Sequence, residues 1–150
     1  MNLYIELETY NREFESRMLL ALEAVSRDYN VVIAHRDIIQ KFALENILPP
    51  GIIHMKDANS GSYQIEKLKK LRKKNFFLTA QDEESGMLNE KFEQFAKLRF
   101  NNFKSFKYLN YFFCWGPRDF NYLKKKYKIS KLTGSPRYDL YINKKKKIKK

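Results

Sequence analysis

At residues 2–35 the chain reads NLYIELETYNREFESRMLLALEAVSRDYNVVIAH, and this stretch decides the fold. Its first segment alternates apolar and polar residues, which is typical of a strand. Apolar residues then recur at helical spacing, at Phe14, Met18, Leu22 and Val25. The short apolar run NVVIAH that follows is typical of a buried strand. The stretch therefore predicts a strand, a helix and a second strand, the unit from which parallel sheets are built.

The same alternation continues along the rest of the chain. Further strands are predicted at 51–55, 75–80, 111–115 and 130–134, and helices at 36–46, 62–74, 89–100 and 117–128. With about six strands, this pattern predicts an α/β protein, a Rossmann-like three-layer domain with a mostly parallel sheet. Residues 143–150 are rich in lysine and have little to bury, so we expect a disordered tail after a single domain at 1–142.

Composition narrows the classes of protein and of partner. The chain has 150 residues, of which 43% are hydrophobic, enough for one packed core. Its net charge is +13, and the six lysines at 144–150 account for part of it, since 13 minus 6 leaves +7. Such an excess suits an anionic partner, whether nucleic acid, acidic lipid or the phosphates of a nucleotide sugar. The acidic amino terminus and the lone Cys114 favour a cytoplasmic protein without a signal peptide.

Three adjacent carboxylates stand in the stretch QDEESG, namely Asp82, Glu83 and Glu84. They follow a predicted strand and precede a predicted helix, at the carboxyl edge of the sheet where ligands of such folds bind. Their mutual repulsion raises the proton affinity of at least one, which suits a general base. A base must reach its substrate, so we expect the acids in a solvent-reachable cleft near Glu8 and Arg137. The alternative is that they cap the next helix, although Gly86 indicates a special backbone conformation here.

Two further groups of polar residues are expected at the same edge. In the motif TGSPRYD a tight turn at Gly134 and Ser135 precedes Arg137, whose planar guanidinium suits a carboxylate or phosphate. The alternative is an ordinary surface turn with a solvated arginine. Glu8 and Arg12 follow the first strand, where they either bind a ligand or form an ordinary salt bridge at the start of a helix.

Other patterns point away from metals and nucleic acid. His35 and His54 have no partners at the spacing of metal ligands, and the sequence has no glycine-rich phosphate loop, so we expect neither a metal nor a cofactor. The aromatic and lysine residues between 95 and 127 could form a stacking platform for single-stranded nucleic acid. Their strand and helical spacing favours core packing instead, so nucleic acid is not expected as a partner.

Several stretches together resemble the amino-terminal half of the surface carbohydrate biosynthesis proteins, which are bacterial glycosyltransferase-like proteins of the two-domain GT-B type. These stretches run in order from Leu3 to Leu140: LYIELETYNREFESRMLLALEAVSRDYNVVIAHR, LPPGIIHMKD, QDEESG, YFFCWG and LTGSPRYD. The acidic turn also resembles the acidic-acidic-glycine motif of bacterial sialyltransferases and Kdo transferases, in which a carboxylate deprotonates the acceptor hydroxyl. Here Ser85 separates Glu84 from Gly86, which departs from that motif.

The resemblance implies the acceptor-side half of a glycosyltransferase that uses a nucleotide-activated sugar in capsule or lipopolysaccharide-type biosynthesis. The base would be Asp82, Glu83 or Glu84, and the acceptor contacts would be Glu8, Arg12, Gly86, Gly134, Ser135 and Arg137. The implied partners are a saccharide or glycolipid acceptor, a nucleotide sugar only with a second domain or chain, and an anionic membrane at the periphery. Whether the chain is active alone stays open. The alternatives are a non-catalytic remnant or accessory binding subunit and, less favoured, a basic nucleic-acid-binding module.

Overall fold

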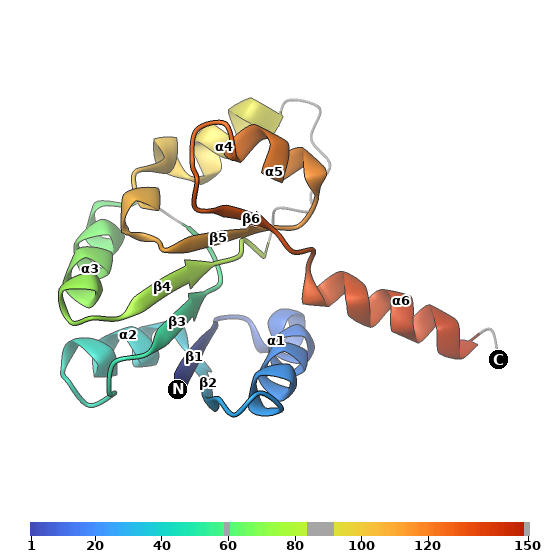
Figure 1. Ribbon diagram of the computed structural model, residues 1–150, viewed down its shortest axis with the longest axis horizontal. Coiled ribbons are helices and arrows are strands. Elements are labelled where there is room, and N and C mark those ends of the chain that lie inside the picture. The colour runs from blue at the N-terminus through green and yellow to red at the C-terminus, as the bar shows by residue number, and fades with distance from the viewer. Residues whose placement is uncertain (59–60, 84–91, 149–150) are drawn as a thin grey trace.

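The computed structural model describes residues 1–58, 61–83 and 92–148, and these form an α/β fold around one six-stranded sheet (Figure 1). The strands are β1 (Asn2–Leu7), β2 (Asn30–His35), β3 (Ile52–Met55), β4 (Phe77–Ala80), β5 (Tyr111–Cys114) and β6 (Ser130–Leu132). The helices are α1 (Tyr10–Val25), α2 (Arg36–Leu44), α3 (Ser62–Lys73), α4 (Phe92–Arg99), α5 (Pro117–Leu123) and α6 (Pro136–Ile148). Two short 3-10 helices, η1 (Asn101–Phe103) and η2 (Phe106–Tyr108), precede β5.

The sheet order is β2-β1-β3-β4-β5-β6, and every neighbouring pair is parallel. The chain passes from β1 to β2 on one side and then returns across β1 to β3, so the strand order reverses between β1 and β3. In open parallel sheets the crevice at such a reversal, beyond the carboxyl ends of the strands, is the usual place for a ligand.

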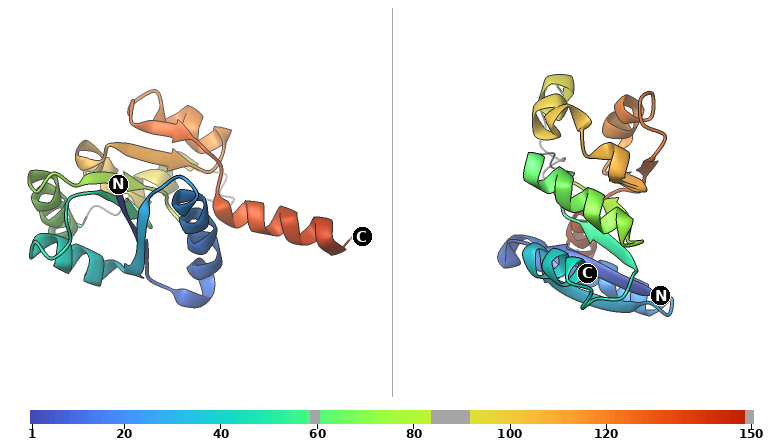
Figure 2. Two further views of the ribbon diagram at one scale, coloured as in Figure 1. Left: turned by 60° about the horizontal axis from the view of Figure 1, so that its bottom comes forward. Right: turned by 90° about the vertical axis from the view of Figure 1, so that its left-hand side faces the viewer.

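Two layers of helices lie on the two faces of the sheet. The larger core joins one face to α2, α3, α4, α5 and the 3-10 helices; its fully buried members include Tyr4, Ile53, Leu78, Phe112, Ile39, Ala43, Leu68, Leu71, Ala96 and Leu123. The smaller core joins the other face to α1, through Leu3, Ile5, Ala21 and Ala24. Helix α6 begins beside α1 and then extends away from the body, as Figures 1 and 2 show.

These observations confirm the predicted fold class, a Rossmann-like three-layer domain. Each strand predicted from the sequence is present, with bounds that differ by no more than two residues from the prediction at either end. The aromatic residues expected in the core are there as well, since Phe100, Phe103, Phe106 and Phe112 are buried and their rings pack against one another. A stacking platform for nucleic acid would need such rings at the surface.

The structure differs from the prediction in the lysine-rich segment from Asn143 onward, which was expected to be disordered. Helix α6 runs through to Ile148, so its backbone is helical over most of the segment predicted to be disordered from Asn143 onward. Lysine is a good helix former, and a helix already started at Pro136 can continue through lysines without burying them.

The face of helix α1 that packs against the sheet is not the one that its apolar residues predict. Leu22 is 61% exposed and Val25 is 55% exposed, whereas Glu13, Arg17 and Ala21 are buried. The amino-terminal half of this helix therefore places charged side chains against the carboxyl edge of the sheet. Across the described residues, no helix is both long enough and apolar enough to cross a membrane.

Candidate functional site

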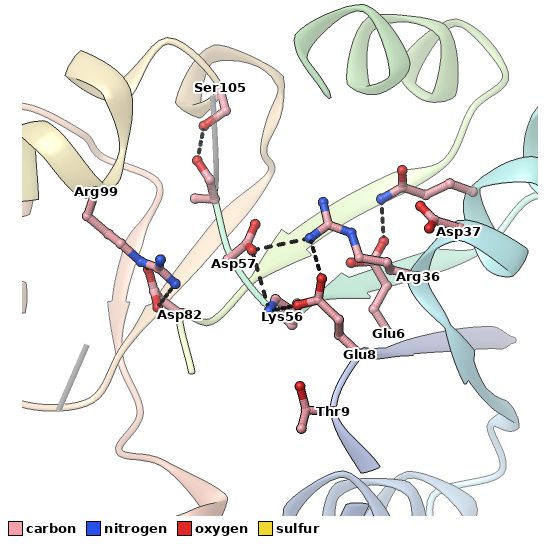
Figure 3. Close-up of polar contacts among 12 residues, drawn as sticks. Glu6, Glu8, Thr9, Arg36, Asp37, Lys56, Asp57, Asp82, Arg99 and Ser105 are labelled. Atoms are coloured by element: carbon pink, nitrogen blue, oxygen red, sulfur yellow. Dashed lines mark hydrogen bonds and ion pairs between the residues drawn. The ribbon is translucent and has the colours of Figure 1, made fainter. Parts of the chain in front are cut away.

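Charged side chains gather at the carboxyl edge of the sheet, where each of four strands ends in a polar segment (Figure 3). These segments supply Glu8 after β1, Arg36 after β2, Lys56 and Asp57 after β3, and Asp82 and Glu83 after β4. The parallel register brings the ends of β1, β2 and β3 level with one another, because Leu7 pairs with His35 and Ile5 pairs with His54. The sequence thus concentrates ionisable groups at the reversal of strand order.

Four of these side chains form a cluster at the reversal point, which we call the switch-point cluster: Glu8, Arg36, Lys56 and Asp57. The Lys56 ammonium pairs with the Glu8 carboxylate and lies 4.0 Å from Oδ2 of Asp57. Nη1 of Arg36 lies 3.7 Å from Oε1 of Glu8 and 3.5 Å from Oδ2 of Asp57 (Figure 3). The Glu8 side chain is 39% exposed, whereas that of Lys56 is 6% exposed. Glu8 is therefore a carboxylate of this cluster that solvent and ligands can reach.

The protonation state of Glu8 follows from these contacts. The hydrogen bond from Lys56 holds the pKa of the Glu8 carboxyl below its ordinary value, with further help from the charges of Lys56 and Arg36. Glu8 is therefore ionised at neutral pH and acts as an acceptor of hydrogen bonds.

Glu13 fills the position that a phosphate would take in many folds of this kind, at the amino terminus of the first helix. Its side chain is fully buried, and Oε2 accepts hydrogen bonds from the backbone N–H of Glu8 at 2.8 Å and of Thr9 at 3.3 Å. Its Oε1 accepts from Nη2 of Arg12 at 2.8 Å. The chain thus supplies its own anion to the start of α1, which disfavours a phosphate there.

Two buried carboxyl groups near this edge have pKa values close to neutrality. Burial raises the pKa of Glu6 to about 7, although Gln40 donates a hydrogen bond of 2.6 Å to its Oε1 and lowers the pKa in part. Burial likewise raises the pKa of Asp119, in the first turn of α5, to about 6. Perturbed carboxyl groups of this kind are frequent at functional sites, and also occur in structural networks.

The first carboxylate of the acidic turn forms a partly buried ion pair, in which the partner Arg99 is 26% exposed. Asp82 is 1% exposed, and it accepts from Nε of Arg99 at 2.9 Å and from Nη2 of Arg99 at 3.2 Å. This two-point pairing fixes both oxygens of the carboxylate (Figure 3). Arg99 comes from the end of α4, so the pair ties that helix to the end of β4.

The second carboxylate, Glu83, lies between two arginines from the opposite layer. Its Oε1 is 2.9 Å from Nη2 of Arg17 on α1, and its Oε2 is 3.4 Å from Nη2 of Arg137 on α6. Arg17 is 1% exposed and Glu83 is 4% exposed, so this is a buried pair. Burial raises the pKa of Glu83 despite the two arginines, and burial lowers the pKa of Arg17. The pair joins α1, β4 and α6 at one point.

The expected solvent-reachable position is therefore wrong for Asp82 and Glu83. A chain of net positive charge provides arginines on three helices, and these draw the two acids inward instead of leaving them at the surface. Arg137 does lie beside the acidic turn, as predicted. Glu8 is connected to the turn through Lys56, whose side chain pairs with Glu8 and whose carbonyl accepts from the Glu83 backbone N–H at 3.0 Å. Glu84 and Gly86 lie outside the described residues.

The glycine-containing turn ends β6 and starts α6. Gly134 has a φ of 81°, a left-handed conformation that favours glycine, and its carbonyl accepts from Nε2 of Gln81 at 2.6 Å. Ser135 is buried, and its carbonyl accepts from the backbone N–H of Tyr138. Nη2 of Arg137 donates to the Arg12 carbonyl at 2.8 Å. These residues hold α6 against α1 and β4.

Sequence reasoning missed several members of this edge: Glu6, Glu13, Arg17, Arg36, Lys56, Asp57 and Arg99. The rule that ligands bind at strand ends could have found Arg36, Lys56 and Asp57, because each lies within two residues of the end of a predicted strand. Arg17 and Arg99 lie on helices and carry no such signal. Within the described ranges, no group of three His, Cys, Asp or Glu side chains is arranged to hold a metal ion.

The arrangement can do two things chemically. The switch-point cluster presents an ionised, partly exposed carboxylate between a lysine and an arginine, which suits hydrogen bonding to a polar, hydroxyl-bearing ligand. The ion pairs of Asp82 and Glu83 tie the end of β4 to α4, α1 and α6 beside it. Comparison adds no relative to this picture, since no protein-family model, no curated protein and no solved structure matches the chain.

Proposed function

We propose that this protein is the acceptor-side domain of a GT-B-type glycosyltransferase of surface carbohydrate biosynthesis, and that it binds a saccharide or glycolipid acceptor at the carboxyl edge of its sheet. The observation that carries the proposal is the switch-point cluster, in which the 39% exposed Glu8 stands at the reversal of strand order. The resemblance of the acidic turn and of the TGSPRYD turn to this class of protein supports it.

In this proposal Glu8 accepts a hydrogen bond from an acceptor hydroxyl, since it is ionised and partly exposed. Asp82 and Glu83 act as positioning residues, because both carboxylates are themselves buried and each is paired with an arginine. Asp57 and Arg36 orient Glu8 through the contacts of the cluster. The nucleotide sugar belongs to a second domain or chain, which agrees with Glu13 occupying the start of α1.

A second candidate function is an accessory subunit that binds the saccharide without catalysing transfer. The burial of Asp82 and Glu83 favours it, because a general base must come within hydrogen-bond reach of the proton that it removes. The two functions differ in one measurement, which is sugar transfer after the protein is mixed with a donor-binding partner chain. Transfer above the rate of the partner alone supports the enzyme, and binding without transfer supports the accessory role.

The binding site itself is tested with a glycan array probed with the labelled protein, followed by NMR titration with a saccharide that the array selects. We expect the backbone signals of Glu8 and Asp57 to shift. The Glu8→Gln variant should bind about tenfold more weakly, since hydrogen bonds to charged groups contribute about 1.5–3 kcal/mol. It should also fold, because Lys56 keeps Glu13 and Asp57 within 4.0 Å.

The matched control is Glu23→Gln on α1, which removes a side-chain carboxylate that is 60% exposed and should leave binding unchanged. If no glycan binds, or if both variants bind equally well, the acceptor site is misassigned. Binding to single-stranded nucleic acid with a steep dependence on salt would instead support the basic-module alternative.

A peripheral contact with an anionic membrane is a further proposal for α6. This helix extends from the body (Figure 2). Tyr141 and Ile142 on it are 60% and 53% exposed. Exposed aromatic and aliphatic residues next to a run of lysines suit the interface of an anionic bilayer. Co-flotation with vesicles that contain phosphatidylserine, and its loss on neutral vesicles, is the expected result.

A further inference from the structure

A cavity lies on the face of the sheet that α1 covers only in part. Helix α1 packs over β1 and β2, whereas β3, β4 and β5 on this face border a cavity of about 480 Å³. Helix α6 reaches its edge through Pro136 and Asp139. The opposite face of the same strands is closed by the larger core. The cavity is therefore an interruption in the second helical layer.

The lining is mostly apolar and aromatic. Phe77 and Tyr111 are 37% and 39% exposed, and their ring centroids lie 5.7 Å apart. Phe113 continues the row, 6.4 Å from Tyr111 in a stacked arrangement. The volume lies within the range of about 300–1,000 Å³ that small-molecule pockets occupy. Such pockets combine an apolar wall with a few well-placed polar groups.

The polar group here is the imidazole of His54, which lines the cavity and is 4% exposed. Its Nδ1 lies 2.9 Å from Oγ1 of Thr79, while its Nε2 is buried without a hydrogen-bond partner in the described part of the chain. A buried polar atom without a partner costs free energy, so this atom marks a place where a ligand group would be stabilised.

The charge of the site follows from its surroundings. Burial holds the pKa of His54 well below its ordinary value, and the positive charge of Arg17 lowers it further. The ring is therefore neutral at neutral pH. Asp139 stands at the edge of the cavity. A neutral ring and a nearby carboxylate disfavour an anionic ligand.

We propose that this cavity binds an uncharged, largely apolar molecule that carries a hydroxyl group, with the hydroxyl on Nε2 of His54 and the apolar part on Phe77, Tyr111 and Phe113. A hydroxyl can donate or accept a hydrogen bond, so it pairs with Nε2 in either tautomer of the ring. The inference is independent of the proposed carbohydrate function, because it uses neither Glu8 nor the acidic turn.

The test uses three probes of one shape: 2-naphthol, naphthalene and naphthalene-2-carboxylate. Binding is followed at neutral pH by NMR of the imidazoles, of which the chain has 2. We expect 2-naphthol to shift the signals of His54 and to leave those of His35 in place. It should bind about fivefold more tightly than naphthalene, the scale of one added hydrogen bond. The carboxylate should bind about tenfold more weakly than 2-naphthol.

Variants separate the hydrogen bond from the apolar contact. His54→Phe should bind 2-naphthol and naphthalene equally, whereas His35→Asn, which keeps a cap for α2, should behave as the parent. Equal binding of the three probes by the parent, or a preference for 2-naphthol that survives in His54→Phe, would overturn the proposal. The parent measurement decides the matter if His54→Phe does not fold. A stable dimer in sedimentation that blocks all three probes would also overturn it, because the face would then be an interface.

Discussion

Replacing Glu6 by glutamine should make the protein more stable at neutral and alkaline pH, although the change removes a hydrogen-bonded charge. Glu6 is 1% exposed, and the amide Nε2 of Gln40 donates to its Oε1. The other amide atom, Oε1 of Gln40, is buried without a partner in the described structure. A glutamine at position 6 keeps the shape of the side chain, carries no charge and can donate to that oxygen.

The magnitude follows from the pKa of Glu6, which burial raises from 4.5 to about 7. Between these pH values the folded protein binds a proton that the unfolded chain has released. The contribution of Glu6 to stability is therefore fully present below pH 4.5 and is lost as the pH rises to about 7. The difference between the two pKa values corresponds to roughly 3 kcal/mol, so the advantage of Glu6→Gln should grow by about that amount across this window.

The assay is urea unfolding of both proteins at intervals between pH 4 and pH 9, followed by the fluorescence of Trp115, the single tryptophan. Subtracting the two free energies of unfolding removes the titration of groups that do not interact with Glu6. Glu23→Gln is the control, because its carboxylate is 60% exposed and the change removes only a surface pair with Arg27, so its effect on the free energy of unfolding should stay below about 1 kcal/mol. A flat curve for Glu6→Gln, or one that falls with rising pH, would refute the reasoning.

Three further changes test the rest of the structure. Glu83→Gln should lower the free energy of unfolding in urea by about 3–5 kcal/mol, because it leaves the buried Arg17 without its carboxylate. The double variant Arg17→Met with Glu83→Leu should recover much of that loss. A cost of Glu83→Gln below about 0.5 kcal/mol would mean that the pair is solvated. Gly134→Ala should cost about 1 kcal/mol through its φ of 81° alone, since no atom lies within 4 Å of an added Cβ; a neutral result would place the turn in another conformation. Removal of residues 143–150 should lower the melting temperature in calorimetry by less than about 2 °C, because Ile142, the last residue kept, is already 53% exposed in the intact chain. A larger drop would show that the removed part of α6 packs against the body.

The fold was predictable because hydrophobic spacing reports the period of each element. Runs such as NVVIAH and YFFCW are typical of strands. NVVIAH was expected to be a buried strand, whereas it forms the edge strand β2, in which no residue is buried. Helix α6 was not predicted, since its sequence after the glycine turn mixes tyrosines with lysines and has no apolar stripe. Local propensity and a proline at its first position start that helix, and these signals are weaker than periodicity.

The candidate site was predictable only in its location. Parallel strands bring their carboxyl ends to one edge of the sheet, so the acids after β4 had to lie near Glu8. The pattern of a single strand does not reveal which side chains of the neighbouring helices face those acids. The apolar stripe of α1, with Leu22 and Val25, indicates the wrong buried face for the same reason. A helix can bury charges where another element supplies the opposite charge, and Arg17 meets Glu83, which follows β4 and lies more than sixty residues further along the chain. Whether a charged face of a helix is buried is thus decided by oppositely charged side chains on other elements, which hydrophobic periodicity does not detect. In this protein Arg17 and Glu83 meet in this way at the carboxyl edge of the sheet, where a ligand would bind.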